Sequence, residues 1–262
     1  MNAYGFTGDS STGKIIMRGA ASGLRDVLLE LGGKNVGIIF PDADLEEAAK
    51  TCAMASFTNT GQVCLSIEKL YVAREIFEPF MTLFVNHARK ITLGGPSDDR
   101  ADIGPLISKK HRERVQSFVD NACEEGAEII CGGKAPSFGD ERDNGYFFEP
   151  TILTGLSEDA HVMTNEIFGP VCHVGPFDSE AEVLGYANQP PYGLISMIWT
   201  KDVSRAHRFG RSIRAGINWV NCWQVRYLRT PLQGFDQSGV GTQGGRQSLE
   251  FYTNVSTVTM ML

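Results

Sequence analysis

The sequence has no long apolar run, no run of basic residues and no secretory pattern, and each absence excludes a class of protein. No stretch of the 262 residues is long and apolar enough to span a bilayer, so a membrane protein is not expected. The net charge of −7, with Lys and Arg scattered along the chain, disfavours nucleic acid or an anionic membrane as a partner. The first residues lack a basic segment followed by an apolar one, so we expect no secretory signal.

Patterns typical of metal sites and disulfide frameworks are also missing. The six cysteines, at positions 52, 64, 123, 131, 172 and 222, include no CxxC pair, and the five histidines include no HxxxH pair. We therefore expect no metal, free thiols and a reducing, cytoplasmic location. The hydrophobic content of 42% and the charged content of 21% are typical of a globular protein with a large core.

One cysteine and one glutamate have a setting that suits catalysis. Cys64 follows the loop 59–62, and Glu30 directly precedes Leu31-Gly32-Gly33. A thiolate can attack an electrophilic carbon, and a carboxylate can then activate the water that releases the product. From chemistry alone, a lone cysteine is more often a small buried hydrophobic residue, and a lone glutamate more often ends a strand or lies on the surface.

Short apolar strands alternate with amphipathic helices along the chain. Strands are expected at 3–6, 27–31, 36–40, 66–73, 127–131, 146–148, 150–154, 195–199 and 215–221. Helices are expected at 11–21, from the cap at 41–44 to 57, and at 75–91, 109–125, 180–188 and 203–214, with an exposed loop at 135–145. This alternation predicts an α/β fold with an open, largely parallel sheet flanked by helices.

The turn Thr7-Gly8-Asp9 lies between a predicted strand and a predicted helix. Small residues at a helix start expose backbone N–H groups, and the helix dipole favours a phosphate there. An ordinary capped helix is the alternative, and a carboxylate at Asp9 is unfavourable beside a phosphate. We therefore expect Gly8, rather than Asp9, to contact such a group.

Four segments together resemble the signature motifs of the aldehyde dehydrogenase family. They are Phe6-Thr7-Gly8, Glu30-Leu31-Gly32-Gly33-Lys34, Gly61-Gln62-Val63-Cys64 and Glu166-Ile167-Phe168-Gly169-Pro170, in the family's order and at about its spacing. The resemblance runs from about Tyr4 to the C-terminus and covers the C-terminal half of a family member. Within the family, the segments 219–223, 228–231 and 248–252 look most like the 2-hydroxymuconic and 2-aminomuconic semialdehyde dehydrogenases.

The resemblance implies NAD-dependent oxidation of an aldehyde, in this branch a muconic semialdehyde, to a carboxylate, with NADP not excluded. Cys64 would be the nucleophile and Glu30 the general base of the hydrolytic step. Arg226 would bind the substrate carboxylate, because a guanidinium forms bidentate pairs with carboxylates. Arg229 would be structural, and solvated arginines at both positions are the open alternative.

The resemblance also implies contacts to the cofactor. Gly8 and Leu31 would lie against it, Glu166 would accept hydrogen bonds from the nicotinamide ribose, and Phe168 would pack against the nicotinamide. Taken alone, the segment around Glu166 could equally be an acidic loop with a core phenylalanine.

Three parts are implied along the chain. Residues 1–31 would be a remnant of the dinucleotide-binding domain, 32–232 the catalytic domain, and 233–262 a return segment with an oligomerisation strand. The tail 252–262 alternates like a strand, and in the family this strand pairs with another subunit, so we expect a homo-oligomer. A terminal strand packed on its own domain is the alternative.

Two segments depart from the family pattern, and two other functions compete. Residues 231–239 stand where relatives have a Pro-Phe-Gly-Gly turn, and 241–244 replace a common Gly-Arg-Glu. The family's oxyanion asparagine and its adenosine-ribose lysine have no counterpart in the sequence.

The competing functions are a cofactor-independent thiol esterase and a non-enzymatic oligomerisation partner; the Cys64–Glu30 pair argues against the latter.

Overall fold

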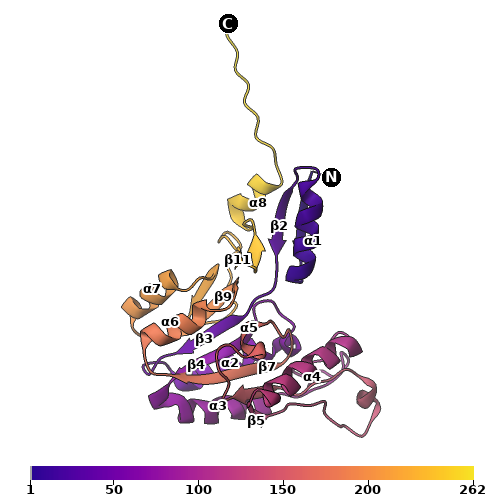
Figure 1. The fold of residues 1–262 in the computed structure, drawn as a ribbon, viewed down its shortest axis with the longest axis vertical. Helices are drawn as coiled ribbons and strands as arrows, with labels where there is room; N and C mark the ends of the chain where they lie inside the picture. The colour runs from indigo at the N-terminus through magenta and orange to yellow at the C-terminus, as the bar shows by residue number, and fades with distance from the viewer. Residues whose placement is uncertain (1) are drawn as a thin grey trace.

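The computed structural model describes residues 2–262, and its largest element is a seven-stranded sheet (Figure 1). The strand order is β10-β9-β3-β4-β7-β6-β5, and all neighbours are parallel except the antiparallel pair β5 and β6. This confirms the predicted open, largely parallel α/β sheet. The strands are β3 (Asn35–Ile39), β4 (Ile67–Ala73), β5 (Glu128–Cys131), β6 (Thr151–Thr154), β7 (Val171–Phe177), β9 (Ile195–Trp199) and β10 (Ile217–Val220).

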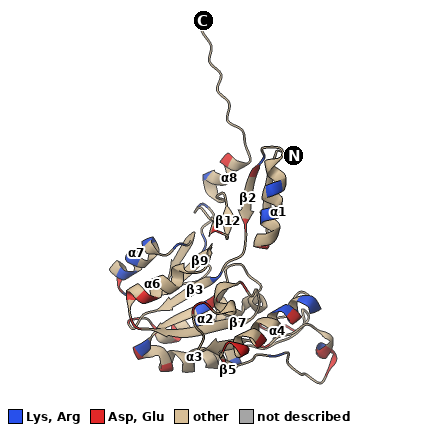
Figure 2. Ribbon diagram, in the orientation of Figure 1, with Lys and Arg blue, Asp and Glu red and all other residues tan. Residues whose placement is uncertain are grey.

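Helices cover both faces of the large sheet, which explains why its central strands are apolar on both sides. On one face, α2 (Leu45–Phe57) and α3 (Phe77–Arg89) form a core with the sheet. On the other face lie α4 (Lys109–Glu124), α5 (His161–Thr164), α6 (Glu180–Asn188) and α7 (Val203–Ser212). Figure 2 shows the charged residues gathered mainly on these outer helices, while the strands are mostly uncharged.

A smaller lobe stands at one end of the large sheet, at the top of Figure 1. Its three-stranded sheet has the order β1-β2-β12, with β1 and β2 parallel and β12 antiparallel to β2. The lobe contains β1 (Ala3–Thr7), α1 (Ser10–Ala21), β2 (Asp26–Glu30), β12 (Gly239–Val240) and α8 (Gly245–Phe251). The remaining elements are the antiparallel pair β8 (Tyr192–Gly193) and β11 (Phe235–Asp236), and the short 3-10 turns η1 (Thr58–Gly61), η2 (Arg74–Ile76) and η3 (Glu141–Asn144).

Two strand predictions inside the sheet region were wrong. Strand β7 was missed, because Gly175 and Pro176 near its end are residues that usually interrupt strands. The strand expected at 146–148 is absent, and Phe147 and Phe148 are instead buried in irregular backbone. Their aromatic side chains contribute to packing without strand pairing.

The C-terminal tail also differs from the prediction. Residues 254–262 form no strand and are exposed, and the tail extends away from the lobe in Figure 1. The alternative that the tail packs on its own domain is therefore wrong. A strand needs a neighbouring strand for its hydrogen bonds, so pairing with another subunit stays a prediction, as do the boundaries at 31/32 and 232/233. Among residues 2–262, no helix has the length and apolar character needed to cross a membrane.

Helix α1 begins with a side-chain cap. The Asp9 carboxylate accepts hydrogen bonds from the backbone N–H groups of Ser11 (2.8 Å) and Thr12 (3.4 Å), and from the Ser11 hydroxyl. The Ser11 hydroxyl bond is the main cause that holds the pKa of Asp9 below its usual range. Asp9 is therefore a helix cap, and it already occupies N–H groups that a phosphate would use.

We expect Asp9→Ala to lower the free energy of unfolding by about 1 kcal/mol, because the capped N–H groups lose their acceptor. Asp9→Ser should recover most of this loss, because serine also caps helices. Since the folded pKa of Asp9 is lowered, its contribution should be present at neutral pH and disappear as the pH falls through that lowered value. Urea unfolding followed by circular dichroism measures both effects, and equal stability of the wild type and Asp9→Ala would contradict the assignment.

Candidate active site

Three loops meet at one edge of the large sheet. Residues 31–34 lead into β3, 61–66 lead into β4 and 165–170 lead into β7, and these three strands are neighbours. Parallel pairing brings the amino ends of neighbouring strands to the same edge, so the loops must lie side by side. Residues 31–34 also connect β2 to β3. Glu30, at the carboxyl end of β2, therefore lies near the same edge of the large sheet.

The turn that carries Cys64 is held by two side chains from distant elements. The Asn35 side-chain amide donates hydrogen bonds to the carbonyls of Cys64 (2.7 Å) and Ser66 (2.8 Å). The Trp223 indole N–H donates to the Leu65 carbonyl (2.9 Å). The backbone on both sides of the cysteine is thus fixed to β3 and to the segment after β10.

The loop before Cys64 has an uncommon backbone. Asn59, Thr60 and Gly61 follow one another with φ of 53°, 58° and 68°, in the left-handed region. A side chain at Gly61 would place its Cβ 2.1 Å from the Gly169 carbonyl oxygen. Glycine therefore permits the close approach of the cysteine loop and the loop 165–170.

Glu30 is a buried carboxyl group with spare hydrogen-bonding capacity. It is 5% exposed, and its Oε1 atom has no hydrogen-bond partner among residues 2–262. Burial raises the pKa of Glu30 to about 7, and the positive charge of Arg226 acts in the opposite direction. A carboxyl group that titrates near neutrality suits a general base.

The Cys64 thiol is half-buried and lies in the electrostatic field of several charges. Burial raises the pKa of the Cys64 thiol above its usual value, and the negative charges of Glu166 and Glu30 raise it further. Its own backbone N–H and the charge of Arg226 act to lower it. The structure thus brings the predicted nucleophile, base and substrate arginine into one electrostatic environment, although Arg226 itself is exposed.

A cavity of about 540 Å³ opens beside Cys64. Five of the predicted site residues line it, while Glu30 and Arg226 lie outside the lining. The lining residues are Thr7, Gly8, Asp9, Leu31, Gly32, Gln62, Val63, Cys64, His111, Arg114, Glu166 and Phe168.

Glu166 reaches into the cavity next to the residues 32–33. Its Oε1 atom accepts a hydrogen bond from the Gly33 N–H (3.0 Å), and a Cβ on Gly32 would lie 2.1 Å from its Oε2 atom. Burial and then the charge of Glu68 raise the pKa of Glu166 to about 7. Phe168 beside it has a left-handed backbone with φ of 59°.

Several residues that hold this site were not predicted. Glu68 on β4 pairs with Lys34 (2.5 Å) and accepts backbone hydrogen bonds from the loop 165–170, and His111 and Arg114 on α4 donate to the same loop. Lys34 belongs to a quoted motif but had no role assigned. Glu68 could have been recognised from the sequence, because Glu68 and Lys69 are adjacent charged residues in an otherwise apolar strand.

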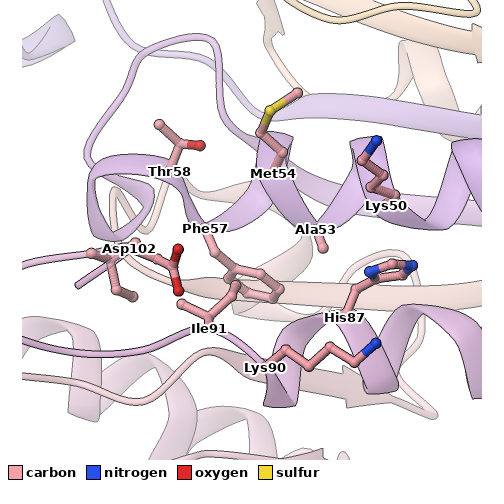
Figure 3. A pocket seen from close by; sticks show the side chains of 10 residues that line it. Lys50, Ala53, Met54, Phe57, Thr58, His87, Lys90, Ile91 and Asp102 are labelled. Atoms are coloured by element: carbon pink, nitrogen blue, oxygen red, sulfur yellow. The ribbon is translucent and has the colours of Figure 1, made fainter. Parts of the chain in front are cut away.

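A second cavity, of about 350 Å³, lies between α2 and α3 (Figure 3). The exposed Lys50 and Lys90 lie beside the half-buried His87, and Phe57 is buried beneath. None of the predicted site residues lines this cavity. Among residues 2–262, no group of three His, Cys, Asp or Glu side chains could hold a metal ion.

Comparisons with curated proteins find close relatives. A 2-aminomuconic 6-semialdehyde dehydrogenase from Pseudomonas sp is 48% identical over the whole chain, which covers 53% of that relative. A 2-hydroxymuconic semialdehyde dehydrogenase from Pseudomonas putida is also 48% identical over the whole chain, which covers 54% of it. The chain thus spans about half the length of the curated relatives it matches.

Solved structures of aldehyde dehydrogenases are also similar to this chain. A betaine aldehyde dehydrogenase from Staphylococcus aureus, solved in complex with NAD+, has 37% identity and a TM-score of 0.93, over 96% of this chain and 50% of that one. A mutant aldehyde dehydrogenase from Bacillus cereus has 37% identity and a TM-score of 0.94, over 98% of this chain and 52% of that one. The model of the aldehyde dehydrogenase family matches residues 1–258, and the chain belongs to this family.

Proposed function

We propose that this chain carries the catalytic half of an NAD-dependent aldehyde dehydrogenase that oxidises a muconic semialdehyde to a carboxylate. The observation that supports this most directly is the buried carboxyl of Glu30, whose charge acts on Cys64, whose Oε1 has no partner among residues 2–262 and whose pKa is raised to about 7. Family membership and the muconic semialdehyde relatives support the same reaction.

In the first step, Cys64 loses its proton to solvent and its thiolate forms a bond to the aldehyde carbon. The aldehyde oxygen becomes an alkoxide, to which the backbone N–H of Cys64 donates a hydrogen bond. The tetrahedral carbon expels hydride far more easily than an aldehyde carbon does, because the alkoxide electrons form the new C=O bond of the thioester.

The residues lining the cavity fit a nicotinamide and its ribose. Glu166 uses Oε1 for the Gly33 N–H, which leaves Oε2 to accept hydrogen bonds from ribose hydroxyls. Phe168 and Leu31 supply apolar surface, and Gly8 lies at the same cavity. When bound, NAD supplies the acceptor for the hydride. NAD is proposed over NADP because NAD+ is what the similar betaine aldehyde dehydrogenase contains.

In the second step, Glu30 accepts a proton from a water molecule that attacks the thioester carbon. The C–S bond breaks, the acid leaves, and the Cys64 sulfur takes up the proton that Glu30 accepted. Glu30 can act as a base only when it is ionised, so the hydrolytic rate should rise as the pH increases through about 7.

Arg226 is proposed to bind the carboxylate that a muconic semialdehyde carries. Its positive charge already acts on Glu30 and Cys64, so a carboxylate bound to it would lie close to the reacting carbon. Neutral aldehydes lack this interaction.

Two further assignments belong to this proposal. The exposed tail 254–262 pairs with a second copy to form a homo-oligomer, because an alternating segment without a partner strand is suited to edge pairing. The location is cytoplasmic, since the cysteines are free thiols.

A cofactor-independent thiol esterase is the second candidate function, because Cys64 and Glu30 could hydrolyse an activated ester without hydride transfer.

We expect the purified chain to bind NAD in a saturable titration followed by the fluorescence of Trp199, Trp219 and Trp223. Addition of a muconic semialdehyde should then yield NADH. Cys64→Ala should abolish NADH formation and change the dissociation constant for NAD by no more than a few-fold. Cys222→Ala is the matched control and should retain activity. Ester hydrolysis that depends on Cys64, with no NAD binding at millimolar concentration, would establish the esterase instead.

Glu30→Gln should lower hydrolytic turnover by about 10²–10⁴-fold, because it removes the general base. It should also shift the pH dependence of Cys64 alkylation by iodoacetamide to lower pH, because a negative charge that raises the pKa of the thiol is lost. Mass spectrometry measures both the alkylation and the acyl-enzyme that accumulates. An unchanged or higher alkylation pKa in Glu30→Gln would contradict the described charge environment.

Arg226→Ala should lower kcat/KM for a muconic semialdehyde by about 10–100-fold, as expected for loss of a charge-assisted hydrogen bond of about 1.5–3 kcal/mol. The same variant should shift Cys64 alkylation to higher pH, because a nearby positive charge is removed. Arg229→Ala serves as the control, and an uncharged aldehyde as the control substrate. Equal losses for both substrates would argue against carboxylate recognition by Arg226.

A further inference from the structure

The turn from Glu166 to Phe168 carries two of the proposed cofactor contacts, and its backbone is held from both sides. Phe168 adopts the left-handed conformation with φ of 59°, which a non-glycine residue rarely takes without support. The turn therefore depends on groups that fix it.

Glu68 holds one side of this turn with a single carboxylate. Its Oε1 atom accepts a hydrogen bond from the Phe168 N–H (2.8 Å), and both of its oxygens lie within hydrogen-bond distance of the Ile167 N–H (3.1 and 3.0 Å). Glu68 is 4% exposed, so water cannot replace it as the acceptor.

Lys34 holds Glu68 in place. The Lys34 side chain is fully buried and its Nζ lies 2.5 Å from the Glu68 carboxylate. Lys34 follows Gly33, whose N–H donates to Glu166. One ion pair thus connects the segment after Glu30, the strand after Cys64 and the turn that carries Glu166.

Helix α4 holds the opposite side of the turn through its carbonyl groups. Arg114 donates to the carbonyls of Glu166 (2.8 Å) and Ile167 (3.2 Å), and the His111 Nε2 atom lies 2.7 Å from the Phe168 carbonyl. The N–H groups on one side are satisfied by Glu68 and the carbonyls on the other by α4, so the turn has little freedom.

We propose that Glu68, held by Lys34, is a positioning residue that presets the Glu166–Phe168 turn so that both side chains face the cavity beside Cys64. This inference rests on the proposed function, since the benefit of the preset turn is tighter cofactor binding. Glu68 touches neither the cavity nor the reacting atoms, so its effect on the reaction passes through the turn.

The charge of Glu68 also acts on Glu166 directly. It is the second cause, after burial, that raises the pKa of Glu166 to about 7, while the Gly33 N–H, Lys34 and Arg114 act to lower it. Cys64 and Tyr192 are the other titratable groups in the field of Glu166. Removing the Glu68 charge therefore lowers the pKa of Glu166.

The test compares Glu68→Gln with Glu158→Gln in the full chain. Glu158 forms a second, largely buried ion pair with Lys69 (3.3 Å) and makes no hydrogen bond to the turn, which makes it the matched control. Hydrogen exchange of the Ile167 and Phe168 amides, read by mass spectrometry on peptides spanning 165–170, should be at least tenfold faster in Glu68→Gln and unchanged in Glu158→Gln.

A second readout separates positioning from loss of stability. In Glu68→Gln the dissociation constant for NAD should rise at least tenfold, and its pH dependence near pH 7 should shift to lower pH. Ester turnover by Cys64 should stay within threefold. If Glu68→Gln does not fold because Lys34 is left unpaired, the double variant Lys34→Met/Glu68→Gln removes both charges. It is scored by amide exchange and by the dissociation constant for NAD, because loss of Lys34 acts against the shift in the pKa of Glu166.

Unchanged exchange at Ile167 and Phe168, or equal acceleration in Glu158→Gln, would overturn the proposal. Failure of the wild-type chain to bind NAD would instead refute the proposed function, and the exchange data would still decide whether Glu68 fixes the turn.

Discussion

Parallel pairing of β3, β4 and β7 is the constraint on which the site depends. Because these strands are neighbours and run in one direction, the three loops that precede them reach the same edge of the sheet. The proposed base Glu30, the proposed nucleophile Cys64 and the acidic turn come from segments far apart in the sequence. No local motif could bring them together; the strand order does. The small lobe then meets this edge through β2, and only the four residues 31–34 separate Glu30 at its end from the start of β3.

Buried charge is the second organising feature. Lys34 and Glu68 lie out of water at the junction of the loops, and breaking such a pair by removal of one partner costs about 3–5 kcal/mol. The Glu68 carboxylate contrasts with that of Glu30, which is equally buried but has an oxygen without a partner among residues 2–262. A satisfied carboxylate fixes backbone, while an unsatisfied one keeps the capacity to accept a proton. The same chemical group thus holds backbone at Glu68, and at Glu30 it is free for the proposed role as a base.

The sequence allowed the α/β class, most strands and helices, and the segments that form the site to be predicted. Cys64, Gly8, Leu31, Glu166 and Phe168, which come from the four motifs, line one cavity, and their roles stay predictions. Contacts between distant segments were out of reach, because hydrogen bonds such as those of Glu68 depend on strand register rather than on local pattern. Strand β7 was missed because its glycine and proline obscure its apolar character, and the tail could not be assigned because a strand is defined by its neighbour.

The connection between the two sheets has a consequence for how a ligand enters. Residues 31–34 are all buried; Leu31 donates to the Ser238 carbonyl (2.9 Å), Gly33 donates to Glu166, and Lys34 pairs with Glu68. A linker held at three of its four residues is a poor hinge, since a hinge must absorb changes in backbone angle. Residues 31–34 therefore offer little freedom for hinge motion between the lobe and the large sheet.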